Sequence, residues 1–218
     1  MAADVDRMSG GRLILGLGIG IDDQEFSSLG LAMPSVRQRL RALKETVMSL
    51  RRLWSEGMQP PPVQSSSVPI LIAGGGERST LRQVAQYADA ANFAPTASMG
   101  PMYALTAEDV RRKLSVLEQY CGELDRPVSS VLVADNALPV IVAESRDRVT
   151  EKLRAVPERT RDRFRTTGII GTPEAVTQIY QELIDLGLRY FVAWVLGNDV
   201  ETLELLGTRV VPNVMAGN

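Results

Sequence analysis

The sequence predicts an α/β protein built on parallel strands, and three observations lead to this fold class. Short apolar runs alternate along the chain with longer amphipathic segments, which is typical of strands joined by helical crossovers. Two of the apolar runs end in glycine-rich turns, the kind of connection that leads from a buried strand toward a helix. The chain has 218 residues, of which 44% are hydrophobic and 23% charged, so we expect one domain over 1–218 with a substantial core.

The first half of the chain alternates predicted strands and helices. Residues 13–17 (Leu-Ile-Leu-Gly-Leu) are apolar at almost every position and predict a strand buried on both faces. A long helix is expected over 34–55, because apolar residues recur there at steps of three and four, and Gly57 can end it. Further along, the pattern predicts a buried strand over 69–73, a helix over 78–88 and a brief strand over 90–94.

The second half continues the same alternation. Thr106 and Asp109 have the spacing of a capping box and start a helix that runs to Cys121. Thr172-Pro173-Glu174 is a strong helix start, with a capping residue, a proline in the first turn and an acid near the positive end. The remaining predicted elements are one or two strands over 128–142, a polar helix over 146–165, a strand over 190–196 and a last helix over 200–214.

Composition excludes several kinds of function. The chain has no histidine, which removes Ser-His-Asp and Cys-His catalytic sites and every zinc site that needs imidazole. A net charge of -2 argues against nucleic acid or an anionic membrane as partner. We expect neither a membrane span nor a signal peptide, because no long apolar run and no leader pattern is visible. The single cysteine, Cys121, excludes an internal disulfide and fits the reducing cytoplasm.

The glycine loop after residues 69–73 is the sharper of two candidate sites. Consecutive glycines let backbone N–H groups approach an anion, and the start of a helix adds free donors and a positive dipole end. It is not a Walker A loop, because no Gly-Lys-Ser/Thr follows. Spacing alone leaves two readings open, a phosphate site or a tight turn capped by Ser79 or Thr80. The candidate phosphate-binding residues are Gly74, Gly75, Gly76, Arg78, Ser79 and Thr80.

The glycine loop after residues 13–17 is the second candidate. A dinucleotide fingerprint needs a third glycine where Ile21 stands, and the acids Asp22 and Asp23 would repel a pyrophosphate, so we reject that reading. Gly18 and Gly20 instead allow the backbone to lie against a flat, uncharged ring system. The alternative, which spacing alone favours somewhat, is a turn of small residues that closes over the sheet.

The other candidate residues give weaker evidence of a functional role. Asp22, Asp23 and Glu25 could bind a hard metal ion, but a solvated acidic turn explains them better, and we predict no metal site. Trp54 and Trp194 fit core or sheet positions. Cys121 lies on an apolar helical face with no histidine to activate it, which favours packing. No catalytic acid or base can be named from these residues.

Several motifs, taken in order, resemble the bacterial luciferase-like monooxygenase family, and most closely its branch that depends on the deazaflavin coenzyme F420. The resemblance spans nearly the whole chain, and its two most specific parts are the Ser-Gly-Gly-Arg strand and the triple-glycine strand. The matching segments are 6–12 (Asp-Arg-Met-Ser-Gly-Gly-Arg) with Leu-Ile-Leu-Gly-Leu-Gly-Ile-Gly, Glu25 with Leu29-Gly30, 39–54, 69–82, Tyr87-Ala88-Asp89 with Asn92, and Gly171-Thr172-Pro173-Glu174.

The resemblance implies a (β/α)8 TIM barrel that binds F420 or FMN at its carboxyl face. The loop of Gly74 to Gly76 with Arg78 to Thr80 would then hold the cofactor phosphate, and Gly18 and Gly20 would lie near the ring, in agreement with the reading from the residues alone. The implied chemistry is hydride transfer between F420 and an unknown organic substrate, or activation of O₂ by reduced FMN. Such cofactors perform the redox step, and the protein positions them.

The chain also departs from the family pattern. It starts near the fourth strand of the barrel, so we expect an incomplete barrel that retains about the last five βα units. Ile21 and Phe26 stand where an aromatic residue and a histidine are common, and Ala91 replaces a frequent tryptophan. Open edges of such a sheet predict a homodimer or a partner chain that covers them. The alternatives to an enzyme are a non-catalytic flavin-binding or partner subunit and an inert fragment.

Overall fold

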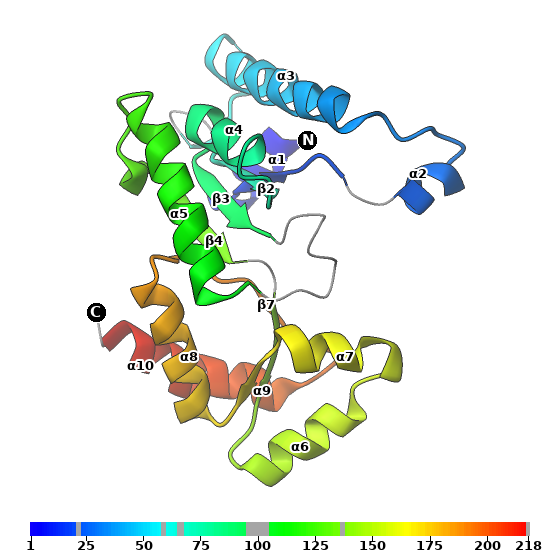
Figure 1. The fold of residues 1–218 in the computed structure, drawn as a ribbon, viewed down its shortest axis with the longest axis vertical. Helices are drawn as coiled ribbons and strands as arrows, with labels where there is room; N and C mark the ends of the chain where they lie inside the picture. The colour runs from blue at the N-terminus through cyan, green and yellow to red at the C-terminus, as the bar shows by residue number, and fades with distance from the viewer. Residues whose placement is uncertain (21–22, 58–59, 65–67, 95–104, 136–137, 217–218) are drawn as a thin grey trace. The chain divides into compact units, whose positions relative to one another are not determined.

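A computed structural model describes residues 1–20, 23–57, 60–64, 68–94, 105–135 and 138–216 (Figure 1). The chain divides into two compact units, of which the first comprises Met1–Asn92 with Ser115–Leu132 and the second Phe93–Leu114 with Val133–Asn218. Within the described residues, no helix combines the length and the apolar character that crossing a membrane requires.

The first unit contains a parallel strand pair flanked by helices. β1 (Leu15–Leu17) pairs in parallel with β2 (Ile70–Gly74), and the sheet continues in the order β1-β2-β3-β4. The other elements that begin in this unit are α1 (Ala2–Ser9), α2 (Asp23–Ser28), α3 (Val36–Ser55), α4 (Thr80–Tyr87), β3 (Ala90–Phe93) and β4 (Leu132–Asp135), while α5 (Ala107–Gly122) belongs to both units.

The predicted strand over 13–17 is shorter and more open than the sequence indicates. Only Leu15–Leu17 form β1, Gly16 is exposed, and the two leucines are half-buried. β1 stands at the end of the strand order, so among the described residues it is covered on one edge alone. The expectation of a strand buried on both faces was therefore wrong for β1, whereas Ile70 and Ile72 of β2 are almost fully buried.

A buried carboxylate explains the first of the family-like motifs. Asp6 of α1 is inaccessible to solvent, and its Oδ2 accepts hydrogen bonds from the backbone N–H groups of Val63 (2.8 Å) and Gln64 (3.1 Å). The Nε2 of Gln64 donates to Asp6 Oδ1 (2.7 Å) and to the carbonyl of Leu13 (2.8 Å), at the approach to β1. Asp6 thus fastens α1 to the loop that precedes β2.

A second motif, Tyr87-Ala88-Asp89, has a comparable structural role. Asp89 Oδ2 accepts a hydrogen bond from the N–H of Ile70 (2.7 Å), and its own N–H donates to the carbonyl of Ile70 (2.8 Å). Arg51 of α3 pairs with the same carboxylate oxygen (2.7 Å) and donates to the carbonyl of Tyr87 (3.0 Å). These bonds align the starts of β2 and β3 and attach α3 to them.

The second unit has its own parallel sheet, of order β6-β5-β7. Helix α8 and the C-terminal helical segment pack on β5 through a core that includes Val140, Val142, Val176, Leu205 and Val210. Thr172 is the N-cap of α8 and Pro173 its first residue, as the sequence predicts. The elements are β5 (Leu138–Val142), α6 (Arg146–Ala155), α7 (Glu158–Thr167), β6 (Ile169–Gly171), α8 (Pro173–Asp185), β7 (Ala193–Trp194), α9 (Val200–Leu205), the π-helical turn η3 (Leu206–Val210) and α10 (Val211–Ala216).

Prolines account for three differences from the predicted elements of this unit. The polar helix over 146–165 is two helices, because Pro157 disfavours helical backbone at Val156, which is extended. The strand over 190–196 is reduced to Ala193–Trp194, paired with Leu138 and with Pro139, which has no N–H for the ladder. The helix over 200–214 contains a wide π turn just before Pro212, which cannot donate to the carbonyl four residues back.

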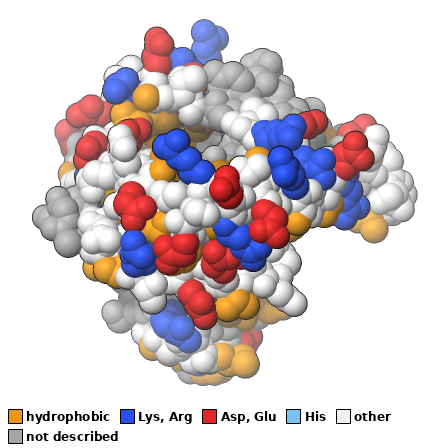
Figure 2. Space-filling model, turned by 90° about the horizontal axis from the view of Figure 1, so that it is seen from below, with side chains coloured by type: hydrophobic (Ala, Val, Ile, Leu, Met, Phe, Trp, Pro, Cys, Tyr) orange, Lys and Arg blue, Asp and Glu red, His pale blue; other side chains and the backbone are white. Residues whose placement is uncertain are grey.

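A polar network closes the carboxyl end of β5. The hydroxyl of Thr202 is buried and lies within hydrogen-bond distance of both the N–H and the carbonyl of Val142, the last residue of β5. Lys152 donates to the same carbonyl (2.8 Å) and pairs with Asp199 (2.6 Å). Burial raises the pKa of Asp199, but hydrogen bonds from Lys152 and Thr202 outweigh it and leave the pKa lowered. On the face drawn in Figure 2, basic and acidic side chains are interspersed, with no large area of one charge.

The environment of Asp6 predicts a specific dependence of stability on pH. Burial raises the pKa of Asp6, but hydrogen bonds from Gln64 and Val63 outweigh it and hold the pKa below its ordinary value. The stabilisation by this carboxylate is therefore complete above about pH 4 and is lost as the pH falls through the lowered pKa of the folded state. We expect Asp6→Asn to be less stable than the wild type at neutral pH.

Urea unfolding of the wild type and of Asp6→Asn across the acid range measures this contribution. The stability difference between the two proteins is expected to stay constant at neutral pH and to narrow below about pH 4. A difference that stays the same through the whole acid range would contradict the role given to Asp6.

Candidate functional site

The two glycine loops predicted from the sequence leave neighbouring strands at the same edge of one sheet. The register of β1 and β2 pairs Leu17 with Ile72, so Gly18 follows β1 where Ala73 and Gly74 end β2. A Cβ placed on Gly18 would lie 3.8 Å from the carbonyl oxygen of Ala73, which shows how near the two chain segments come. The structure therefore brings the two loops together at the carboxyl edge, within the first unit.

The side chain of Thr80 determines the shape of the triple-glycine loop. Thr80 is only 6% exposed, and a Cβ on Gly74 would lie 2.8 Å from its Cγ2. A Cβ on Gly76 would lie 3.0 Å both from its Oγ1 and from the Oγ of Ser79. A side chain at Gly74 would force Thr80 to shift, and one at Gly76 would need Ser79 and Thr80 to move by a few tenths of an ångström. Glycine at both positions thus allows the loop to pack closely on the first turn of the helix.

The start of α4 folds back on the loop through backbone bonds. The N–H groups of Thr80 (2.8 Å) and Leu81 (3.1 Å) both donate to the carbonyl of Gly76. Ser79 is the N-cap residue, but its side chain makes no capping hydrogen bond, so the turn is not built on a hydroxyl cap at this position. Arg78 is exposed and Ser79 is half-buried, which leaves both at the surface beside the helix start, whereas Thr80 lies beneath it.

The Gly18–Gly20 loop is held by a residue that the sequence reading gave no role. Arg39, in the first turns of α3, donates from Nη1 to the carbonyls of Ile19 (3.0 Å) and Gly20, and from Nε to the carbonyl of Pro34 (3.0 Å). The only sequence signal was its place inside a segment that resembles the family. Ile21 and Asp22 lie outside the described residues, and Asp23 and Glu25 are exposed on α2.

The remaining candidates have packing roles or lie apart from one another. Trp54 is buried in α3, and Trp194 stacks at a tilt on Phe164 with a centroid distance of 5.4 Å. Cys121 is buried in α5, and burial raises the pKa of its thiol against a smaller effect of Arg126. Across the part of the chain that the structure describes, no three His, Cys, Asp or Glu side chains gather as a metal site would require.

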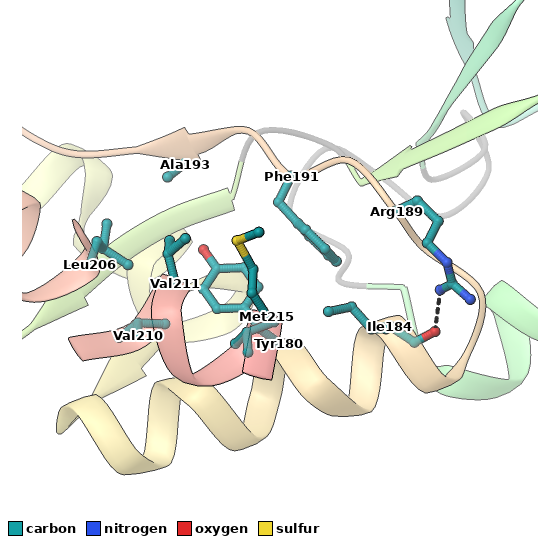
Figure 3. Close-up of a pocket in the computed structure, with 10 residues that line it drawn as sticks. Tyr180, Ile184, Arg189, Phe191, Ala193, Leu206, Val210, Val211 and Met215 are labelled. Atoms are coloured by element: carbon teal, nitrogen blue, oxygen red, sulfur yellow. Dashed lines mark hydrogen bonds between the residues drawn. The ribbon is translucent and has the colours of Figure 1, made fainter. Parts of the chain in front are cut away.

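A pocket of about 360 Å³ lies in the second unit and shares no residue with the glycine loops (Figure 3). Its aromatic wall is formed by Tyr180 and Phe191, whose rings meet edge to face with centroids 5.1 Å apart. The Arg189 guanidinium at one end donates to the carbonyl of Ile184 (2.5 Å). The pocket is otherwise aliphatic and offers no group of residues suited to acid–base work; its lining is Tyr180, Ile184, Arg189, Phe191, Ala193, Leu206, Val210, Val211, Val214 and Met215.

Comparisons with known proteins support the α/β reading and the predicted resemblance. A model of the luciferase-like monooxygenase family matches residues 1–159. A search of curated protein sequences finds no significant match. Among solved structures, the coenzyme F420-dependent tetrahydromethanopterin reductase of Methanopyrus kandleri is 18% identical, with a TM-score of 0.66, covering 98% of this chain and 77% of that one.

Two further solved structures have the same fold. An F420-dependent secondary alcohol dehydrogenase, in complex with an F420-acetone adduct, is 18% identical with a TM-score of 0.73, covering 98% of this chain and 73% of that one. The oxygenating constituent of 3,6-diketocamphane monooxygenase from Pseudomonas putida, in complex with FMN, is 14% identical with a TM-score of 0.67, covering 97% and 74%. The fold is accordingly an incomplete barrel of the (β/α)8 type, as predicted.

The packing of Thr80 on the loop predicts that Gly74→Ala destabilises the first unit. Both the contact with Thr80 and the backbone φ of +152° oppose a side chain at this position, so we expect a loss of about 1–3 kcal/mol in the free energy of unfolding. Gly122→Ala is the matched control, because a Cβ there meets nothing within 4 Å. Urea denaturation measures both variants. Equal stability of Gly74→Ala and the wild type would contradict the role of this contact.

Proposed function

We propose, from the premise that the chain belongs to the luciferase-like monooxygenase family, that it is an oxidoreductase which binds F420, or alternatively FMN, at the two glycine loops. The reaction is hydride transfer between F420 and an organic substrate, or oxygenation by O₂ if FMN is the cofactor. F420 is preferred because the family-like motifs most resemble the F420-dependent branch. The preference also agrees with two structural neighbours that carry F420 in their names.

One observation carries this proposal: two glycine loops with different chemistry meet at the carboxyl edge of one parallel strand pair. In α/β folds, ligands bind at that edge because loops and helix starts converge there. The Gly74–Gly76 loop lies beside an exposed arginine and a half-buried serine hydroxyl, which suit a phosphate, although the first two N–H groups of α4 already bond to Gly76. Gly18 and Gly20 are exposed and carry no side chain, and Gly18 lies close to Ala73, which suits a flat ring.

The donor sets fit the two ends of such a cofactor. Gly74 and Gly76 would present backbone to the phosphate, with the buried Gly75 forming the turn between them, while Arg78 and Ser79 would approach it from the helix start and Thr80 would support the loop from below. Gly18 and Gly20 would lie along the ring. The bound cofactor would supply the redox chemistry, so the chain's own part is to bind and orient it beside a small-molecule substrate. No residue is assigned as catalytic acid or base.

A second candidate function is a non-catalytic chain that binds flavin or a partner subunit. The specific observation in its favour is the complete lack of histidine, the commonest general acid and base. Turnover separates the two functions. Reduced F420 with a broad set of acceptors gives oxidation of F420 if the chain is an enzyme, and stoichiometric binding alone if it is a carrier. We place either form in the cytoplasm, as its single buried cysteine favours.

Binding itself is tested by titrating the purified chain with F420 and with FMN, followed by absorbance and fluorescence of the cofactor. Saturable binding of either cofactor at one site per chain supports the proposal, and tighter binding of F420 supports the preference between them. Failure of both cofactors to bind would overturn it.

Arg78 is the residue whose removal tests the phosphate end. Because a charge-assisted contact to phosphate is lost, Arg78→Ala is expected to raise the Kd of the cofactor by about 10- to 150-fold. The fold should be unchanged, since Arg78 is exposed. Arg82→Ala is the control, because Arg82 is also exposed on α4 but lies over the Tyr120 ring at 5.8 Å. An unchanged Kd for Arg78→Ala would remove Arg78 from the site.

We also propose that a second copy or a partner chain covers the open sheet edges. β1 stands at the end of its sheet, and apolar side chains are exposed in the segment before β7, among them Tyr190 (39%) and Val192 (41%), although the N–H of Arg189 in that segment bonds to Val133 of β4 (2.8 Å). Sedimentation velocity over a range of concentrations measures the state. We expect a dimer or larger assembly. A monodisperse monomer would contradict the proposal that a second copy of the chain covers the open edge.

A further inference from the structure

We propose that Arg39 is a positioning residue: by holding the carbonyls of Ile19 and Gly20, it turns backbone N–H donors of the Gly18–Gly20 loop toward the carbonyl oxygens of a bound cofactor ring. This inference deepens the proposed function and rests on it. Among the described residues, the hydrogen bonds of the Arg39 side chain all go to backbone carbonyls, and the inference gives these bonds a function.

The contacts of Arg39 join two separate segments of chain. Nη1 donates to the carbonyl of Ile19 (3.0 Å) and to that of Gly20, while Nε donates to the carbonyl of Pro34 (3.0 Å). A guanidinium suits this arrangement because its donors form a rigid planar fork that can serve several acceptors at once. A lysine has one flexible nitrogen and cannot reproduce it.

Arg39 is itself held in place by the start of α3. The Oε1 of Gln38 accepts hydrogen bonds from the N–H (2.9 Å) and the hydroxyl (2.7 Å) of Ser35, and Ser35 Oγ accepts from the N–H of Gln38, which completes a capping box. The N–H of Arg39 donates to the carbonyl of Ser35 (3.0 Å). The guanidinium therefore projects from a capped helix start, a rigid base for orienting a loop.

Because Arg39 fixes the direction of the Ile19 carbonyl, it also fixes the direction of the N–H group that follows in the same peptide. In a trans peptide, the carbonyl and the following N–H point to opposite sides. The carbonyl of Ile19 faces Arg39, so the N–H of Gly20 faces away from it. Gly20 has φ of +71°, a left-handed conformation that glycine adopts without strain, and it is exposed. The N–H of Gly20 thus points to the side of this exposed residue away from Arg39, where a bound ligand could accept its hydrogen bond.

The chemistry of the ligand follows from that donor. A backbone N–H binds a carbonyl oxygen, and the pyrimidine-dione end of a flavin or deazaflavin ring carries two of them. Withdrawing density toward those oxygens stabilises the reduced, electron-rich form of the ring. Arg39 would thus act on the ring through the loop, without touching it, and would leave the phosphate end unaffected.

The test compares Arg39→Met with Arg41→Met, a control on the same helix that loses an exposed pair with Glu45. Titration with F420 and with FMN gives the Kd and the absorption spectrum of the bound ring, and competition by inorganic phosphate reports the other end. For Arg39→Met we expect a rise of about tenfold or more in the Kd of the cofactor, loss of the spectral shift on binding, and unchanged competition by phosphate. Arg41→Met should behave as the wild type.

Two further measurements separate orientation from simple stability. Without cofactor, the thermal midpoint of Arg39→Met should stay close to that of the wild type, because the fold does not depend on this tether. Added guanidinium ion at about 10 mM should restore the spectral shift to Arg39→Ala, and ammonium should not, because only guanidinium has the planar fork. Arg39→Lys should resemble Arg39→Met.

Each outcome bears on a different claim. If the wild type binds neither cofactor, the proposed function fails, and the role of Arg39 toward a ring fails with it. If the wild type binds but Arg39→Met has the same affinity and spectrum, the inference alone fails. Equal losses of affinity for the cofactor and for phosphate would also overturn it, because they would show a general structural defect. Loss confined to the ring, with rescue by guanidinium, supports it.

Discussion

The parallel pairing of β1 with β2 is the constraint on which the candidate site depends. The register that joins Leu17 to Ile72 brings two glycine loops, more than fifty residues apart in the sequence, to one edge. Asp89 binds the N–H of Ile70 at the start of β2, and Asp6 binds the N–H groups of Val63 and Gln64 in the loop before β2, where Gln64 in turn bonds to Leu13 before β1. These two carboxylates thus have a structural role, and under the proposed function the backbone of the loops would meet the ligand.

Much of the fold could be predicted because local signals and packing agree. The capping box of Thr106 and Asp109, the Thr172-Pro173 start of α8 and the apolar run of β2 all carry their structure in a few neighbouring residues. The differences arose where one residue overrides a longer pattern, as at Pro157 and Pro212. The solvent exposure of β1 depends on which strands lie beside it, and the local sequence pattern does not determine this.

The candidate site was predictable to a similar extent. Glycine runs after buried strands pointed to both loops, and their meeting at one edge followed from parallel strands. The role of Thr80 beneath Gly74 depends on a contact of a few ångströms, and the tether by Arg39 spans about twenty residues between a side chain and two carbonyls. An arginine on an amphipathic helix has the same local pattern whether it meets water or a distant loop, so sequence spacing could not distinguish the two.

The tether by Arg39 has one more consequence, for how such a site can change. Arg39 bonds to carbonyl oxygens, which every amino acid possesses. Its hydrogen bonds therefore depend on the path of the backbone and do not depend on which side chain stands at position 19. Substitutions at Ile19 can therefore alter the shape and polarity of the wall beside a ring while the backbone donors keep their direction. Under the proposed function, backbone atoms of the loop would orient the ring and the side chain at position 19 would shape its surroundings, so substitution could change the second without the first.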